Sequence, residues 1–152
     1  LARVCPGVEL HFVAPPQLHM PPGIVDEVTH HQSHSPVTHE DLRDVIAAAD
    51  VLYITRVQKE RFADPAEYEA LKLQYVVTPD LMAQGRASLV LMHPLPRVGE
   101  ISPEVDVDPR AAYFRQMENG MFVRMALLAL VLGDSNVIQE YLDTEQPAEA
   151  SA

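Results

Sequence analysis

Two short apolar runs, each ended abruptly by a polar or proline-rich segment, constrain the fold of this chain most strongly. Residues 51–54 (VLYI) run directly into residues 55–61 (TRVQKER), and residues 89–92 (LVLM) run into residues 93–97 (HPLPR). Apolar runs of this length with such boundaries are typical of buried strands. Ligands of open α/β sheets bind beyond the carboxyl ends of the strands, so the two following segments form a candidate ligand site.

The rest of the chain alternates between strand-like and helix-like segments. We expect another strand at 9–14, a polar stretch with a weak edge strand at 29–36, and a helix at 40–49 that is capped by Thr38. Further helices are expected at 22–28, from residue 64 onward, at 80–84 and at 110–132. Strands that alternate with helices predict an α/β fold with a doubly wound parallel sheet.

Two features indicate that the sequence lacks part of such a fold. Three strands are clear in it, whereas a doubly wound sheet usually has about five. The last helix is apolar on nearly every side, and a helix of this kind must be buried on most sides. We therefore expect an N-terminal portion to be missing, with residues 1–133 forming one α/β domain and residues 134–152 an acidic, flexible tail.

Composition and charge argue against several classes of function. The 152 residues carry a net charge of −11 with only two lysines, Lys59 and Lys72, so nucleic acid is not expected as a partner. No apolar run approaches the roughly 20 residues that span a bilayer, so no membrane partner is expected either. The single cysteine, Cys5, excludes an internal disulfide and fits a reducing compartment, which predicts a cytoplasmic protein.

Each of the two segments after the strands has a chemical interpretation. Arg56, just past a strand, can present a bidentate fork to a carboxylate or phosphate, and Gln58 can both donate and accept hydrogen bonds. Pro94 and Pro96 remove N–H donors and fix the backbone, which leaves the carbonyls of Pro94 and Leu95 as acceptors. A cis Leu95–Pro96 bond is compatible with such a turn. Each segment also has a simpler interpretation. Residues 55–61 could be a solvated charged loop, and residues 93–97 could be a rigid loop that only ends the strand.

Metal and nucleotide sites have weaker support in the sequence. Four histidines, His30, His31, His34 and His39, could hold zinc or nickel because imidazole suits both. No cysteine or acidic residue joins them at a known ligand spacing, and a solvent-exposed loop explains them more simply. The acidic residues between 100 and 108 lack the glycine of a calcium loop. The six glycines are isolated, so dinucleotide-binding and P-loop motifs are absent from the sequence.

Three longer segments occur in an order and spacing that resemble aspartate carbamoyltransferases, the eukaryotic ones in particular: TRVQKERF, HPLPRVGEI and DPRAAYFRQMENGMFVRMALL. The resemblance covers about residues 1–133. It implies a trimeric enzyme with two α/β domains, of which the N-terminal one binds carbamoyl phosphate and the C-terminal one binds L-aspartate. The amino group of aspartate would attack carbamoyl phosphate, giving N-carbamoyl-L-aspartate and phosphate for pyrimidine synthesis. No metal and no cofactor is implied.

The resemblance also implies roles for the residues after the two strands. Arg56 would grip a carboxylate of aspartate, and Gln58 would orient its amine or carboxylate. Pro94, Leu95 and Pro96 would contact the carbamoyl group through their backbone. Pro94 stands where the related ornithine enzymes usually have a cysteine, which favours aspartate as the acceptor.

Other segments would control the arrangement of the two domains. Glu60 and Arg61 would hold the closed arrangement, residues 62–73 would form a loop that closes over the site, and the helix at 111–132 would pack on the carbamoyl-phosphate domain. The family's segments that bind phosphate and polarise the carbonyl do not occur in this sequence. The resemblance therefore implies an aspartate-binding half that is inactive alone and needs an N-terminal half as its partner. A non-catalytic scaffold or assembly module, and a metal-binding module based on the four histidines, stay open as alternatives.

Overall fold

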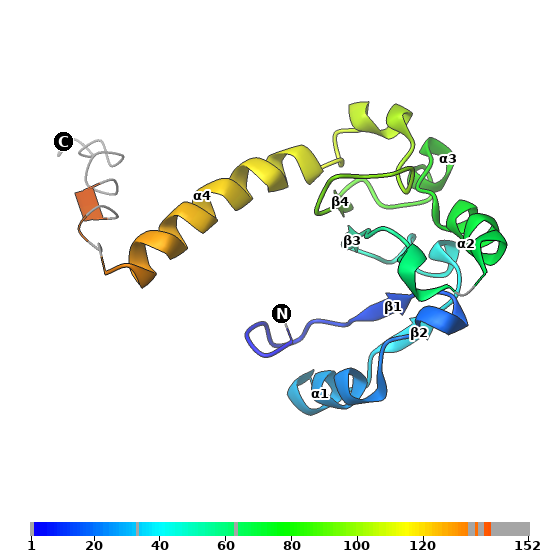
Figure 1. Ribbon diagram of the computed structural model, residues 1–152, viewed down its shortest axis with the longest axis horizontal. Helices are drawn as coiled ribbons and strands as arrows, with labels where there is room; N and C mark the ends of the chain where they lie inside the picture. Colours follow the sequence, from blue (N-terminus) through cyan, green and yellow to red (C-terminus); the bar gives the residue numbers. More distant parts are fainter. Residues whose placement is uncertain (1, 33, 63, 134–135, 137–138, 141–152) are drawn as a thin grey trace. The chain divides into compact units, whose positions relative to one another are not determined.

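The computed structural model describes residues 2–32, 34–62, 64–133, 136 and 139–140 (Figure 1). The chain divides into two compact units, Leu1–Ala112 and Tyr113–Ala152. Most of the expected tail, residues 134–152, lies outside the described residues, so its flexibility remains a prediction. None of the described helices is both long enough and apolar enough to cross a membrane.

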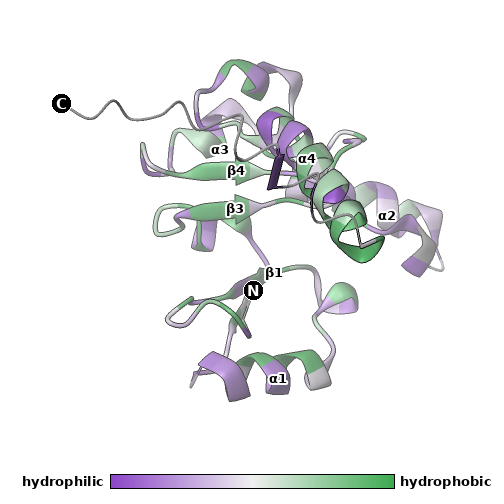
Figure 2. Cartoon of the chain, turned by 90° about the vertical axis from the view of Figure 1, so that its left-hand side faces the viewer, coloured by the Kyte–Doolittle hydropathy of each residue, from purple (hydrophilic) through white to green (hydrophobic). Residues whose placement is uncertain are grey.

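The described residues of the first unit contain four short strands in two parallel pairs. Strand β1 (His11–Val13) pairs with β2 (Val37–His39), and β3 (Val51–Tyr53) pairs with β4 (Val90–Met92). Figure 2 shows β3 and β4 side by side, both coloured as hydrophobic. Parallel strands that alternate with helices confirm the predicted α/β class. Within the described residues the strands form these two separate pairs, β1-β2 and β3-β4, and not one continuous sheet.

The helices begin largely where the sequence predicts them. Thr78 has an extended backbone, and its hydroxyl accepts a hydrogen bond from Leu81 N at 3.2 Å, which caps a helix that opens with Pro79. The α-helices are α1 (Pro22–Gln32), α2 (Pro65–Lys72), α3 (Pro79–Met82) and α4 (Tyr113–Val131). The 3-10 helices are η1 (Pro16–Leu18), η2 (Leu42–Asp44), η3 (Lys59–Arg61), η4 (Leu73–Tyr75) and η5 (Pro103–Val107).

The predicted α-helix at 40–49 is wrong, and so is the position of the weak strand. The strand lies at 37–39, where its pairing with β1 includes Thr38, the residue expected as a helix cap. Asp41 caps the short η2 instead, because its carboxylate accepts from Arg43 N at 2.8 Å. The short η2 then ends at Asp44, and Val45 follows it as the C-cap residue. Val45 and Ile46 are still buried, so tight turns bury the apolar residues that suggested a helix.

The buried core of the first unit includes the β3–β4 pair. Leu52 and Leu91 lie opposite each other in the register and are both buried. A side-chain carbon on Gly85 would lie 2.7 Å from Leu89 Cδ2 and 3.3 Å from Ile46 Cγ1, so glycine lets the turn after α3 approach the core closely. One part of the prediction for residues 51–54 is wrong, since Val51 and Tyr53 are about half exposed and only alternate residues are buried.

The main element of the second unit is α4, which ends at Val131 and is followed by Gly133 with a φ of +83°, as predicted for a C-terminal glycine. Its later turns are coloured as hydrophobic in Figure 2. Their apolar side chains are nevertheless half exposed or more: Met121, Phe122, Val123, Met125, Leu127, Leu128, Leu130 and Val131. An apolar surface of this extent on one helix is typical of a protein-protein contact.

Replacement of Leu91 by alanine should destabilise the chain strongly. Leu91 is 0% exposed, so the substitution leaves a cavity and should lower the free energy of unfolding by about 2–5 kcal/mol. The matched control is Leu128→Ala, which removes the same atoms from a side chain that is 62% exposed and should change stability by less than about 0.5 kcal/mol. Urea unfolding followed by circular dichroism measures both values. Equal losses in the two variants would contradict this assignment of the core.

Candidate substrate site

The segments that follow β3 and β4 leave the sheet at the same edge. Beyond the last paired residues, Ile54 N still donates to Met92 O at 2.9 Å. The segments that begin at Ile54 and His93 therefore follow the ends of two adjacent, parallel strands. The structure thus places the two candidate segments at neighbouring carboxyl ends, which is where α/β sheets bind ligands.

The segment after β3 presents its polar side chains at the surface. Arg56 and Gln58 are both exposed, and the backbone then turns into η3. An exposed guanidinium at a strand end is accessible to an anion and offers paired N–H donors to a carboxylate. Arg61 is also exposed, whereas the side chain of Glu60 lies outside what the structure describes.

The segment after β4 has an unusual backbone. The Leu95–Pro96 peptide bond is cis, and Leu95 has a φ of +42°. A positive φ is rare for a side chain as bulky as leucine, and residues held in such conformations cluster at functional sites. The carbonyls of Pro94 and Leu95 belong to this turn, and Pro94 and Pro96 are exposed. The cis bond that the sequence allows at Leu95–Pro96 is therefore present.

A buried histidine, His93, binds the backbone of this turn. His93 is only 2% exposed, and its Nδ1 accepts a hydrogen bond from Leu95 N at 2.9 Å. Its Nε2 lies 4.0 Å from the carboxylate of Glu100, which is also buried. The other carboxylate oxygen of Glu100 accepts from Val98 N. The two buried side chains thus fix the backbone at two points of the turn, a role that sequence reasoning missed although both residues lie in the HPLPRVGEI segment.

Burial lowers the pKa of His93 below its usual value, because desolvation disfavours the charged imidazolium. The carboxylate of Glu100 opposes this shift, and the guanidinium of Arg97 adds to it. His93 is therefore neutral at pH 7. With Nδ1 accepting from Leu95 N, the ring proton of the neutral form lies on Nε2, on the side of Glu100.

The acidic residues between 100 and 108 are engaged by protein groups. Asp106 forms a bidentate ion pair with Arg97. Asp108 pairs with Arg110, whose Nη2 lies 2.7 Å from Oδ2 of Asp108. The hydrogen bond from Arg110 is the main reason why the pKa of Asp108 lies below its usual value. Arg110 also donates to the carbonyls of Gly85 and Arg86, so it ties this segment to the turn after α3.

The segment expected to close over the site contains α2 and an aromatic contact. The ammonium groups of Lys59 and Lys72 lie 5.8 and 5.5 Å from the centre of the Tyr68 ring, and the ring of Phe62 lies 5.9 Å from it. These contacts join η3 to α2. Any movement of the segment remains a prediction.

The structure does not assemble the four histidines into a metal site. His30 and His31 contact each other through their rings at 5.1 Å, whereas His39 contacts His11. No group of three or more potential ligands that could hold a metal ion is found in the part of the chain that the structure describes. A cleft of about 470 Å³ lies in the first unit, and Asp41, Arg43, Thr78 and Asp80 are among the residues that line it. None of the predicted substrate residues lines this cleft.

Comparison with known proteins identifies the family. The family described as "Aspartate/ornithine carbamoyltransferase, Asp/Orn binding domain" matches residues 1–131. The chain belongs to this family. It is 53% identical over 126 residues to the multifunctional protein CAD of Squalus acanthias, which covers 83% of this chain and 6% of that protein. It is 49% identical over 127 residues to an aspartate carbamoyltransferase catalytic subunit of Methanosarcina acetivorans, which covers 84% of this chain and 41% of that subunit.

Solved structures of the family have the same fold. The catalytic subunit of aspartate transcarbamoylase from M. jannaschii matches with a TM-score of 0.73 and 41% identity, covering 83% of this chain and 41% of that one. The Trypanosoma cruzi enzyme in complex with N-(phosphonacetyl)-L-aspartic acid matches with a TM-score of 0.69 and 41% identity, covering 78% of this chain and 38% of that one. The chain therefore spans about two fifths of the length of the M. acetivorans catalytic subunit and of the T. cruzi enzyme.

Acid should destabilise the chain through His93. The unfolded chain binds a proton at this residue with a pKa of about 6.5, and the folded chain binds it less readily. The contribution of neutral His93 to the free energy of unfolding is fully present above about pH 6.5. It is lost as the pH falls through the lower pKa that His93 has in the folded chain. Substitution of His93 by asparagine keeps an acceptor for Leu95 N and removes the titrating ring, so stability should depend less on pH between about 7 and 5.

Urea unfolding at a series of pH values measures this difference. The matched control is His30→Asn, which replaces an exposed histidine of α1 in the same way. A His93→Asn profile as steep as that of the parent would show that another group causes the acid sensitivity.

Proposed function

We propose that this chain supplies the aspartate-binding half of an aspartate carbamoyltransferase. The enzyme would transfer the carbamoyl group of carbamoyl phosphate to the amino group of L-aspartate, an early reaction of pyrimidine biosynthesis that would take place in the cytoplasm. The observation that carries the proposal is the parallel β3–β4 pairing, which brings Arg56 and Gln58 to the same sheet edge as Pro94, Leu95 and Pro96. The T. cruzi relative is described in complex with carbamoyl phosphate and aspartate, which supports these two substrates.

Each of these residues has a chemical role in the proposed reaction. The Arg56 guanidinium binds a carboxylate of aspartate through charge-assisted hydrogen bonds, and the Gln58 amide orients its amine or carboxylate. The carbonyls of Pro94 and Leu95 accept from the N–H groups of the carbamoyl moiety, while the proline residues offer no competing donor. The left-handed backbone of Leu95, held by His93, fixes the direction of these carbonyls.

The reaction itself needs positioning more than covalent chemistry. The neutral amino nitrogen of aspartate forms a bond to the carbonyl carbon, the bond from that carbon to the phosphate oxygen breaks, and phosphate leaves with the electron pair. The amine loses one proton in the process. The arginine holds the carboxylate, and the backbone carbonyls hold the carbamoyl group. The bimolecular reaction of the two substrates thus becomes effectively unimolecular, which lowers the activation barrier. Glu60 and Arg61 would hold the closed arrangement of the domains.

The chain would be incomplete as a catalyst. Phosphate-binding and carbonyl-polarising segments of the family do not occur in its sequence, and it spans 41% of the archaeal catalytic subunit. The strands form two pairs, and one additional parallel strand between β1 and β3 would join them into a single sheet. The half-exposed apolar surface of α4 would pack on the carbamoyl-phosphate domain. We therefore propose an N-terminal half as the partner and a homotrimer as the complete assembly.

Substitution of Arg56 by alanine should reduce carbamoylaspartate formation by the complete enzyme. Loss of a bidentate contact to a substrate carboxylate removes roughly 3 kcal/mol, or about 100-fold in kcat/KM for aspartate. The matched control is Arg86→Ala, because Arg86 is also exposed and pairs with the exposed Asp50 at 3.3 Å. Assembly of both variants is followed by size-exclusion chromatography. A variant of Arg56 that keeps full activity, or that loses assembly alone, would favour a scaffold over a substrate role.

The chain alone should produce no carbamoylaspartate above background. Addition of the separately purified N-terminal half of a complete relative should restore turnover, because it supplies the phosphate-binding groups. A colorimetric assay of carbamoylaspartate measures both conditions, and the N-terminal half alone is the control. Robust turnover by this chain without its partner would refute the proposed division of the active site.

A further inference from the structure

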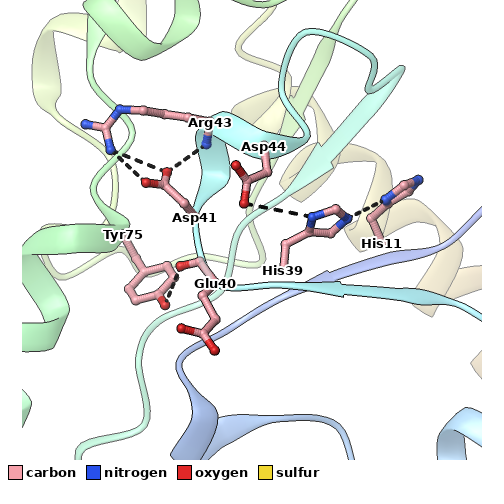
Figure 3. A network of polar contacts seen from close by, with 7 residues as sticks. All are labelled: His11, His39, Glu40, Asp41, Arg43, Asp44 and Tyr75. Atoms are coloured by element: carbon pink, nitrogen blue, oxygen red, sulfur yellow. Dashed lines mark hydrogen bonds and ion pairs between the residues drawn. The ribbon is translucent and has the colours of Figure 1, made fainter.

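Two histidines from neighbouring strands meet through their ring nitrogens. His11 begins β1 and His39 ends β2, and the parallel pairing of these strands brings the residues together although 28 positions separate them. Nδ1 of His11 lies 2.9 Å from Nε2 of His39, and the ring centres are 5.2 Å apart. Figure 3 shows the two rings end to end, with Asp44 beyond His39. The contact is accessible, since the His11 and His39 side chains are 34% and 20% exposed.

Each imidazole has a carboxylate beside its other nitrogen. Nε2 of His11 lies 3.1 Å from a carboxylate oxygen of Glu9, within hydrogen-bond distance. Nδ1 of His39 lies 4.0 Å from a carboxylate oxygen of Asp44, which is the distance of an ion pair. The four side chains thus form a row in the order Glu9, His11, His39, Asp44. The two imidazoles face each other in the middle of this row, and a carboxylate lies at each end.

The tautomers of the two rings decide what the centre of this row can bind. A neutral imidazole carries one N–H, and a neighbouring carboxylate draws that N–H to its own side. In the free chain one of the two facing nitrogens donates to the other at 2.9 Å, and the tautomer decides which one. When both N–H groups turn to the carboxylates instead, the two facing nitrogens present lone pairs to the same place, as coordination of a cation requires. The two carboxylates also leave the row with two negative charges, which a divalent ion would neutralise.

We propose that His11 and His39 form a binding site for a divalent transition-metal ion that prefers imidazole, such as Zn²⁺ or Cu²⁺. In metal sites a ligating histidine almost always donates its other N–H to a carboxylate or carbonyl. Glu9 already lies at this distance from His11, and Asp44 would have to move closer to His39. Zinc–nitrogen bonds of about 2.0–2.1 Å in a tetrahedral site place two ligand nitrogens roughly 3.3 Å apart. A small rotation of the rings supplies this spacing and directs both lone pairs to one point.

The ion would take its remaining ligands from water or from another molecule, because no third protein ligand converges there among the described residues. The two protein ligands lie on different strands, so the ion would link β1 to β2. This proposal rests on the geometry of the row alone and stands apart from the proposed transferase reaction.

Titration of the full chain with Zn²⁺, purified without a histidine tag, tests the site by calorimetry. One ion should bind per chain, and His11→Gln and His39→Gln should each weaken binding at least 10-fold. Glu9→Gln alters only an exposed outer group and should weaken binding about 10-fold, as expected for a carboxylate that supports a ligand. The matched control is the double variant His30→Gln/His31→Gln, which removes two adjacent exposed histidines and should bind as the parent does.

Electron paramagnetic resonance of the Cu²⁺-loaded chain gives an independent readout. The parent spectrum should show coupling to two nitrogens, and His11→Gln should show coupling to one. Far-UV circular dichroism confirms that each variant is folded, and Glu9→Gln tests the site even where a histidine variant unfolds. Absence of Zn²⁺ binding to the parent at millimolar concentration would overturn the proposal. Equal binding by His11→Gln and the parent, or loss of binding in the His30→Gln/His31→Gln control, would also overturn it.

Discussion

The parallel pairing of β3 with β4 is the interaction on which the candidate site depends. It buries Leu52 against the strand that carries Leu91, and it places the carboxyl ends of both strands next to each other. On its other side β4 pairs with the segment at Ala111, through bonds from Leu91 N to Arg110 O and from Ala112 N to Leu91 O. The strand that leads into the proline turn is thus hydrogen-bonded along both edges, which gives the turn a rigid base.

The core and the candidate site are joined through a few polar contacts. His93 continues directly from β4, is buried, and holds Leu95 by one hydrogen bond, so the backbone of the turn depends on a side chain that faces inward. The ion pair between Arg97 and Asp106 and the contacts of Glu100 fix the rest of the turn. A site built from backbone carbonyls requires this kind of support, because a carbonyl has no side-chain rotamer by which to adjust.

The sequence predicts the parts of the structure that local patterns determine. Strands β3 and β4 lie within the predicted runs 51–54 and 89–92, and the helix ending before Gly133 is present, because apolar runs and terminal glycine act locally. Strand β2 was predicted at the wrong residues, since two of its three residues are exposed and its pairing partner β1 is distant in sequence. The contact between His11 and His39 and the bond from Leu95 to His93 depend on tertiary structure and on loop conformation, which no spacing in the sequence reveals.

The apolar surface of α4 has a consequence for the protein in the cell. Side chains such as Phe122, Leu127 and Leu130 remain half exposed in this chain. Chaperones and proteases act on exposed apolar segments of this kind. Any surface that covers α4 would therefore also protect the chain from degradation and from aggregation.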